Sequence, residues 1–166
     1  MILKKLFILF ATIITALSFS ESCQTSPATN QAVSRLPDTH LGELMGQMQY
    51  YTVKLGLSLQ YKNQPLASFY MNEVNETYQD IVDKKITNGT FNISDMIQQL
   101  LSSSKDRMEK VIAKNDTANF EDSYRALVNS CNNCHRETNH AFIVIQEPNE
   151  PFNGQNFGVQ ISPYSE

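Results

Sequence analysis

Apolar residues recur every three or four positions along most of the chain, and short polar breaks divide this pattern into four stretches. Such spacing is typical of helices that bury one face. It predicts helices over residues 40–62, from Asn63 to about residue 83, from Asn92 or Ser94 to about residue 114, and from Asp116 or Thr117 to about residue 138. Helices of about 20 residues with short connections pack most simply as an all-α, up-down-up-down antiparallel four-helix bundle. We place this bundle at residues 38–139.

The start signals and the apolar stripes support these four helices. Asp38 or Thr39 can cap the first helix, Pro65 suits the first turn of the second, and Asp95 suits the start of the third. The predicted core-facing stripes are Leu41, Met45, Met48, Thr52, Leu55 and Leu59; Leu66, Tyr70, Val74, Tyr78 and Ile81; Met96, Leu100, Ser104, Met108, Val111 and Ile112; and Phe120, Tyr124, Leu127, Val128 and Cys131.

Residues 1–22 have the pattern of a signal peptide. The basic MILKK precedes the apolar LFILFATIITALSF, which is short and threonine-rich for a membrane span. Cys23 follows this segment and resembles the lipid-carrying cysteine of bacterial lipoproteins, although Glu21 departs from that motif. We predict lipid attachment at Cys23; the alternative is ordinary cleavage near Ser20 or Ser22. The protein is then exported to the periplasm or cell envelope, and residues 23–37 form a flexible linker.

The last part of the chain differs in character from the helices. AFIVIQ is β-branched and extended, and the following residues are rich in Pro, Gly and Asn. We predict that residues 140–166 form an extended tail that lies over the bundle and uses Phe152 and Phe157 as apolar contacts.

The charge of the chain limits its partners. Residues 1–22 hold Lys4, Lys5 and Glu21, so the rest has 11 Lys and Arg against 16 Asp and Glu, a net charge of −5. This balance argues against nucleic acid and against an anionic membrane surface. It favours a protein partner with a basic docking face, and the predicted lipid at Cys23 is the only expected membrane contact. Homodimer formation is left open.

The stretch CNNCH places Cys131, Cys134 and His135 within five positions near the end of the last predicted helix. In an exported protein, C-x-x-C-H is the signature of covalent c-type haem attachment. Two thiols three residues apart on one helical face can reach the two vinyl groups of a porphyrin, and the next residue can bind the iron. We therefore predict one covalent haem, with Cys131 and Cys134 as attachment residues and His135 as the proximal iron ligand.

Three other interpretations of CNNCH are open. A disulfide redox centre usually lies at a helix N-terminus in a βαβ setting, which this chain lacks. A zinc site needs four ligands, and His40 and His140 are the only other histidines. A structural disulfide would leave His135 without a role.

A helical bundle with C-x-x-C-H in its last helix resembles the class II c-type cytochromes, the family of cytochrome c′ and its low-spin relatives. The resemblance covers residues from about 38 to 138, and CNNCH is its only specific motif. The 31 residues after His135 are longer than that family's usual ending. The resemblance implies a four-helix bundle with one haem. It also implies either a methionine ligand from the first helix or, as in cytochrome c′, a five-coordinate iron.

The order of the helices indicates which residues face the iron from the distal side. In an up-down bundle the fourth helix ends beside the start of the first, where Met45 and Met48 lie on the inward stripe. We predict Met45 as the distal ligand, with Met48 as second choice and Met96 as third, whereas His40 and His140 are expected to be solvated. The side chains expected to pack on the haem are those of Leu41, Met48, Tyr78, Tyr124 and Val128.

These predictions converge on one-electron transfer by an exported monohaem cytochrome c. The sequence offers no nucleophile–base pair, paired catalytic carboxylates or phosphate-binding glycine loop, so we expect no enzymatic activity. The alternative is a five-coordinate haem protein that binds a small gas such as nitric oxide, as a sensor or scavenger. A third hypothesis is a haem-free helical interaction module.

Overall fold

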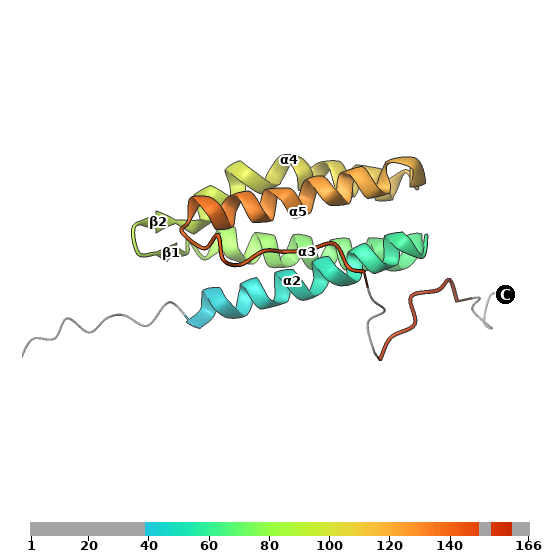
Figure 1. The fold of residues 1–166 in the computed structure, drawn as a ribbon, viewed down its shortest axis with the longest axis horizontal. Helices are drawn as coiled ribbons and strands as arrows, with labels where there is room; N and C mark the ends of the chain where they lie inside the picture. The colour runs from blue at the N-terminus through green and yellow to red at the C-terminus, as the bar shows by residue number, and fades with distance from the viewer. Residues whose placement is uncertain (1–38, 150–153, 161–166) are drawn as a thin grey trace, which may run out of the picture. The chain divides into compact units, whose positions relative to one another are not determined.

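The computed structural model of the protein describes residues 39–149 and 154–160. This part is mostly helical, with four long helices and one short sheet (Figure 1). In chain order the elements are α2 (Thr39–Gln60), α3 (Gln64–Asp83), β1 (Thr87–Asn88), β2 (Phe91–Asn92), α4 (Ile93–Ala113), the 3-10 helix η2 (Thr117–Asn119) and α5 (Phe120–Glu137). The four predicted helices are thus confirmed. The predicted signal peptide, Cys23 and the predicted linker lie outside the described residues.

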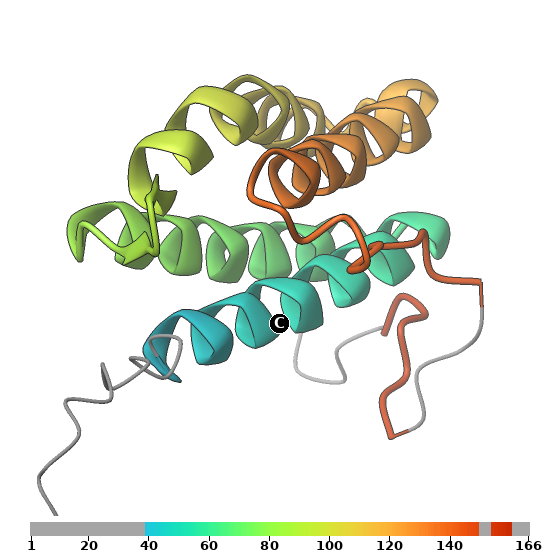
Figure 2. The same ribbon diagram turned by 60° about the vertical axis from the view of Figure 1, so that its left-hand side comes forward.

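The helices pack as two pairs. Helix α2 lies beside α3, and α4 lies beside α5. Figures 1 and 2 place one pair over the other, with α3 contacting α4 and α2 contacting α5. The apolar stripes meet in a shared core, whose most completely buried side chains include Leu55, Leu57, Met71, Ile81, Met108 and Leu127. Among the described residues, no helix combines the length and the apolar character needed to cross a membrane.

Two asparagines begin helices as predicted. The side chain of Asn63 accepts a hydrogen bond from the backbone nitrogen of Leu66, and that of Asn92 accepts one from Asp95. Each bond satisfies a backbone donor that the first turn of a helix would otherwise leave unpaired. Ser94, the other predicted start of α4, instead accepts from the backbone nitrogen of Ile86 at 2.7 Å. This hydrogen bond joins the residue before β1 to the first turn of α4.

The predicted core stripe of α4 is wrong by one position in its first half. Ile97 and Leu101 are buried, whereas Met96 and Leu100 are only half-buried. Both rows are apolar, so helical periodicity alone cannot choose between them. The packing of α4 against α3 and α5 makes the choice, and it leaves Met96 and Leu100 at the margin of the core.

Residues 154–160 of the C-terminal tail lie against the end of α2 and the start of α3. Phe157 is buried, and its ring lies 6.3 Å from that of Tyr61 and 6.4 Å from that of Tyr70. The side-chain amide of Asn63 donates to the carbonyls of Phe157 and Gly158 at 2.9 and 3.0 Å. The predicted contact through Phe157 is confirmed, and Phe152 lies outside the described residues.

We expect Gly56→Ala to destabilise the protein, because this glycine lies where α2 meets α5 and the tail. A Cβ atom at position 56 would lie 2.5 Å from Cζ of Tyr124 and 2.9 Å from Cγ of Pro148. The hydroxyl of Tyr124 is held by a 2.9 Å hydrogen bond to the carbonyl of Thr52, so the ring cannot move away freely. Such overpacking costs about 1–3 kcal/mol, measurable by urea unfolding.

Gly42→Ala is the matched control on the same helix. A Cβ atom there meets nothing within 4 Å. Alanine forms helices better than glycine, so this variant should be at least as stable as the wild type. Equal stability of Gly56→Ala and the wild type would contradict the predicted clash.

Candidate functional site

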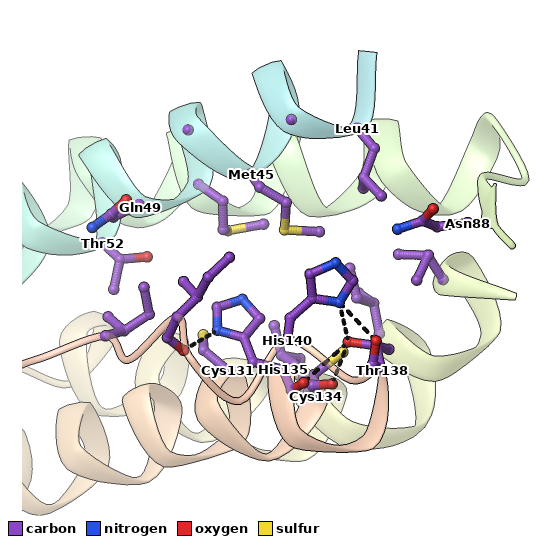
Figure 3. Close-up of a pocket in the computed structure, with 18 residues that line it drawn as sticks. Leu41, Met45, Gln49, Thr52, Asn88, Cys131, Cys134, His135, Thr138 and His140 are labelled. Carbon is purple, nitrogen blue, oxygen red and sulfur yellow. Dashed lines mark hydrogen bonds between the residues drawn. The ribbon is translucent and has the colours of Figure 1, made fainter. Parts of the chain in front are cut away.

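A cavity of about 540 Å³ lies between the start of α2 and the end of α5. Its volume is within the usual range for cofactor sites, about 300–1,000 Å³. All three residues predicted from CNNCH line it, and Met45 and Met48 line it from α2 (Figure 3). The remaining wall is mostly apolar; its members include Leu41, Ile93, Ile97, Leu101, Ile143 and Ile145.

The α2 wall of the cavity contains two glycines that the sequence analysis did not single out. Gly42 and Gly46 are one helical turn apart, both are exposed, and both line the cavity. A Cβ atom at either position would meet nothing within 4 Å. The missing side chains therefore leave the cavity open to solvent along this edge. Two glycines at a spacing of four on an otherwise apolar stripe were the signal for it.

The α5 wall carries the two thiols. Cys131 and Cys134 are free, three residues apart, and on the face that lines the cavity. Burial raises the pKa of the Cys131 thiol to about 12 and also raises the pKa of Cys134. Both thiols are then protonated at neutral pH, whereas thiol–disulfide exchange requires a thiolate. This environment disfavours a disulfide redox centre.

His135 is oriented by the backbone of the tail. Its Nδ1 atom donates a hydrogen bond to the carbonyl of Ile143 at 2.9 Å. Because a carbonyl can only accept, Nδ1 carries the proton and Nε2 of the neutral ring keeps its lone pair. Figure 3 shows the ring projecting from α5 toward the α2 wall. His135 thus presents a nitrogen able to bind a metal on the cavity side.

His140 is not solvated, contrary to the prediction. It is half-buried, lines the cavity, and its Nδ1 atom donates to the carbonyl of Thr138 at 2.7 Å. The cause is the turn that ends α5. Asn139 adopts a left-handed conformation (φ 62°), and the backbone nitrogen of His140 donates to the carbonyl of His135 at 2.7 Å. This Schellman turn folds the chain back over the helix end.

His40 lies apart from the cavity lining, on the first turn of α2. It is exposed as predicted, and its Nδ1 atom lies 3.9 Å from a carboxylate oxygen of Glu43. Met96, the third choice for a distal ligand, is also not among the lining residues.

The five residues predicted to pack on a haem divide into two groups. Leu41 and Met48 line the cavity. Tyr78, Tyr124 and Val128 are buried but are not among the lining residues. Buried tyrosine hydroxyls need partners, and these find them elsewhere: Tyr124 at the carbonyl of Thr52, and Tyr78 at the hydroxyl of Ser102, 2.9 Å away. The tail residues Ile143 and Ile145 also line the cavity, which the sequence did not predict.

Chemically, the site combines two protonated thiols, two imidazoles held by backbone carbonyls and two thioethers around an apolar space. Within residues 39–149 and 154–160, no group of three or more His, Cys, Asp and Glu side chains is placed to hold a metal ion. Comparison of the chain with protein-family models, curated proteins and solved structures found no match.

Proposed function

We propose that this protein is an exported monohaem cytochrome c that transfers single electrons. The observation that carries the proposal is that Cys131, Cys134 and His135 line one apolar cavity, with Met45 and Met48 on the wall contributed by α2. A bare metal ion would need three or four protein ligands, but a haem iron takes four nitrogens from its porphyrin and needs only axial ligands. The donor set and the volume of the cavity therefore fit a covalently bound haem.

The proposal includes the finer architecture, an antiparallel up-down-up-down four-helix bundle of the class II cytochrome type. It is supported by the short connections between helices of similar length and by the contacts of α2 with both α3 and α5. In this arrangement the end of α5 lies beside the start of α2. The resemblance of the sequence to class II c-type cytochromes rests on CNNCH and helix order, and it remains part of the proposal.

Each residue of the site has a distinct role in this proposal. The Cys131 and Cys134 thiols would hold the haem by adding to its two vinyl groups as thioethers, and Nε2 of His135 would be a ligand of its iron. The Met45 sulfur would be the distal ligand: Figure 3 shows Met45 projecting from α2 into the cavity, across from the side on which His135 and His140 lie. When bound, the haem supplies the site that gains and loses the electron. The apolar wall keeps water from the iron and so favours the ferrous state.

The open edge of the cavity and the net charge of the chain are better suited to docking of a redox partner protein than to binding of a substrate. The opening beside Gly42 and Gly46 would leave one edge of the haem accessible. The acidic balance of the chain favours a redox partner with a basic face and disfavours nucleic acid. We further propose that the protein is exported and that a lipid at Cys23 is its only attachment to a membrane.

Absorption spectra of oxidised and reduced protein test this function most directly. The protein should be produced with a system that attaches c-type haem. We expect an intense Soret band, a sharp α band on reduction, and low-spin spectra in both oxidation states. A protein without a Soret band after such production would contradict the proposal and favour the haem-free interaction module. A high-spin spectrum in both states would favour the gas-binding alternative.

A further inference from the structure

After the turn at Asn139, residues 140–145 run back along α5, and two side chains of α5 form hydrogen bonds with their backbone. The carbonyl of Ile143 accepts the hydrogen bond from Nδ1 of His135. The side chain of Asn132 forms two hydrogen bonds with the backbone of Ile145: its amide donates to the carbonyl at 2.9 Å, and its oxygen accepts from the nitrogen at 2.8 Å. We call residues 140–145 the strap.

We propose that Asn132 is a positioning residue for the proximal ligand, acting through the strap. The inference rests on the proposed function, because it concerns how His135 is held toward a haem iron. Asn132 occupies the first variable position of CNNCH, which the attachment chemistry itself leaves unassigned. The Asn132 side chain holds the backbone of Ile145 against α5, and this contact positions the strap. The carbonyl of Ile143 in the strap then determines the orientation and the tautomer of the His135 ring.

The burial of the strap explains why these two hydrogen bonds matter. Ile145 is 8% exposed, but Phe142 is 80%, Val144 62% and Ile143 42% exposed. Apart from Ile145 and His140, the strap gains little from apolar burial, so its position depends on directed bonds. The side-chain amide of Asn132 pairs with both the N–H and the C=O of Ile145, and this two-bond contact defines the distance and the orientation of the strap relative to α5.

The position of the Ile143 carbonyl has an electronic consequence for a metal-bound histidine. A hydrogen bond from Nδ1 to a carbonyl raises the basicity of the ligating ring and fixes its orientation. A more basic ligand stabilises ferric iron and lowers the reduction potential. Loosening the strap should weaken this bond and raise the potential, with the iron ligands and the attachment cysteines unchanged.

The rest of the tail should stay attached when Asn132 is replaced. Arg125 donates to Glu147 at 3.1 Å, and the side chain of Gln60 donates to the carbonyl of Pro148 at 2.7 Å. These contacts lie beyond the strap and do not involve Asn132. Its replacement therefore loosens a short segment and leaves the fold intact.

The test compares Asn132→Ala with Asn133→Ala in the haem-loaded protein. Asn133 is the matched control: it is the neighbouring variable residue of CNNCH, is exposed, and bonds through its side chain to Arg136 on the same helix. Hydrogen–deuterium exchange of peptides covering residues 140–149 should be about tenfold faster in Asn132→Ala, as expected for the loss of two backbone-directed hydrogen bonds. The reduction potential should rise. Asn133→Ala should match the wild type in both measurements.

A second variant separates the two hydrogen bonds. Asn132→Asp keeps the acceptor for the nitrogen of Ile145 but sets a carboxylate oxygen against its carbonyl, so exchange of residues 140–149 should again be faster than in the wild type. The reduction potential is compared only in Asn132→Ala, because the negative charge of Asp would lower the potential by itself. This variant also carries the test if Asn132→Ala fails to accumulate.

Three outcomes are distinguishable. Faster exchange in the Asn132 variants alone, with a raised potential in Asn132→Ala, supports the inference. Covalent haem in every variant, with the Asn132 variants equal to Asn133→Ala in exchange and Asn132→Ala equal to it in potential, overturns the inference and leaves the proposed function intact. Wild-type protein without covalent haem overturns both.

Discussion

Replacing both Cys131 and Cys134 with alanine should abolish covalent haem attachment. The two sulfurs line one cavity and are, in our proposal, the only bonds between porphyrin and chain. Wild-type protein should keep its haem through denaturing electrophoresis and stain for peroxidase activity, whereas the double variant should show no stain. Each single variant keeps one thiol, so it should still bind haem through one thioether bond, but in a smaller amount than the wild type.

Ser130→Ala is the control for this experiment. Ser130 is the neighbour of Cys131 on α5, is not among the cavity-lining residues, and donates its hydroxyl hydrogen bond to Ala126 of the same helix. This variant should stain like the wild type, and circular dichroism should show equal helix content in all variants. Haem that survives denaturation in the double variant would exclude attachment through these cysteines.

Replacing Met45 with alanine should convert the iron from low-spin to high-spin. An iron that keeps the same ligands in both oxidation states reorganises little when the electron arrives, and a thioether ligand also raises the potential. Oxidised wild-type protein should therefore show a weak sulfur-to-iron band in the far red, and the ferrous form should bind carbon monoxide poorly. Met45→Ala should lose the band and bind carbon monoxide readily.

Met48→Ala is the matched control for the distal ligand, one helical turn away on the same cavity wall. Met48 is 7% exposed and belongs to the core, so its truncation should lower the free energy of unfolding by about 2–5 kcal/mol. Its spectrum should stay close to that of the wild type. The reverse spectral pattern would assign ligation to Met48. A wild-type protein that is already high-spin would exclude both methionines and favour gas binding.

Local signals in the sequence were enough to predict the four helices and the starts of α3 and α4. The predicted start of the last helix at Asp116 or Thr117 is wrong by a few residues, because Thr117–Asn119 form a 3-10 helix and α5 begins at Phe120. Asn63 and Asn92 cap α3 and α4 as predicted, because an N-cap depends on contacts within a single helical turn.

Helical periodicity did not predict which side chains of α4 are buried, because adjacent positions of this helix are both apolar. Ile97 and Leu101 are buried in place of Met96 and Leu100, and only the neighbouring helices decide between the two rows.

The candidate site could be predicted only in part. CNNCH and the helix order predicted the end of the last helix beside the start of the first, and in the structure Cys131, Cys134 and His135 line one cavity with Met45 and Met48. Tyr78, Tyr124 and Val128 were expected at the same cavity; they are buried in the core but lie outside the cavity lining. The open edge at Gly42 and Gly46 is made by missing side chains, which an analysis of apolar stripes overlooks.

The sequence by itself determined the helices, their caps and the five-residue motif, because each depends on residues close together in the chain. The tertiary structure decided which apolar row of α4 is buried, how His140 enters the cavity, and how Asn132 and the strap orient His135. These features join residues that are close only after the turn at Asn139 reverses the chain. A hydrogen bond such as that from Asn132 to Ile145 depends on a few ångströms of packing, and no periodicity in the sequence encodes that distance.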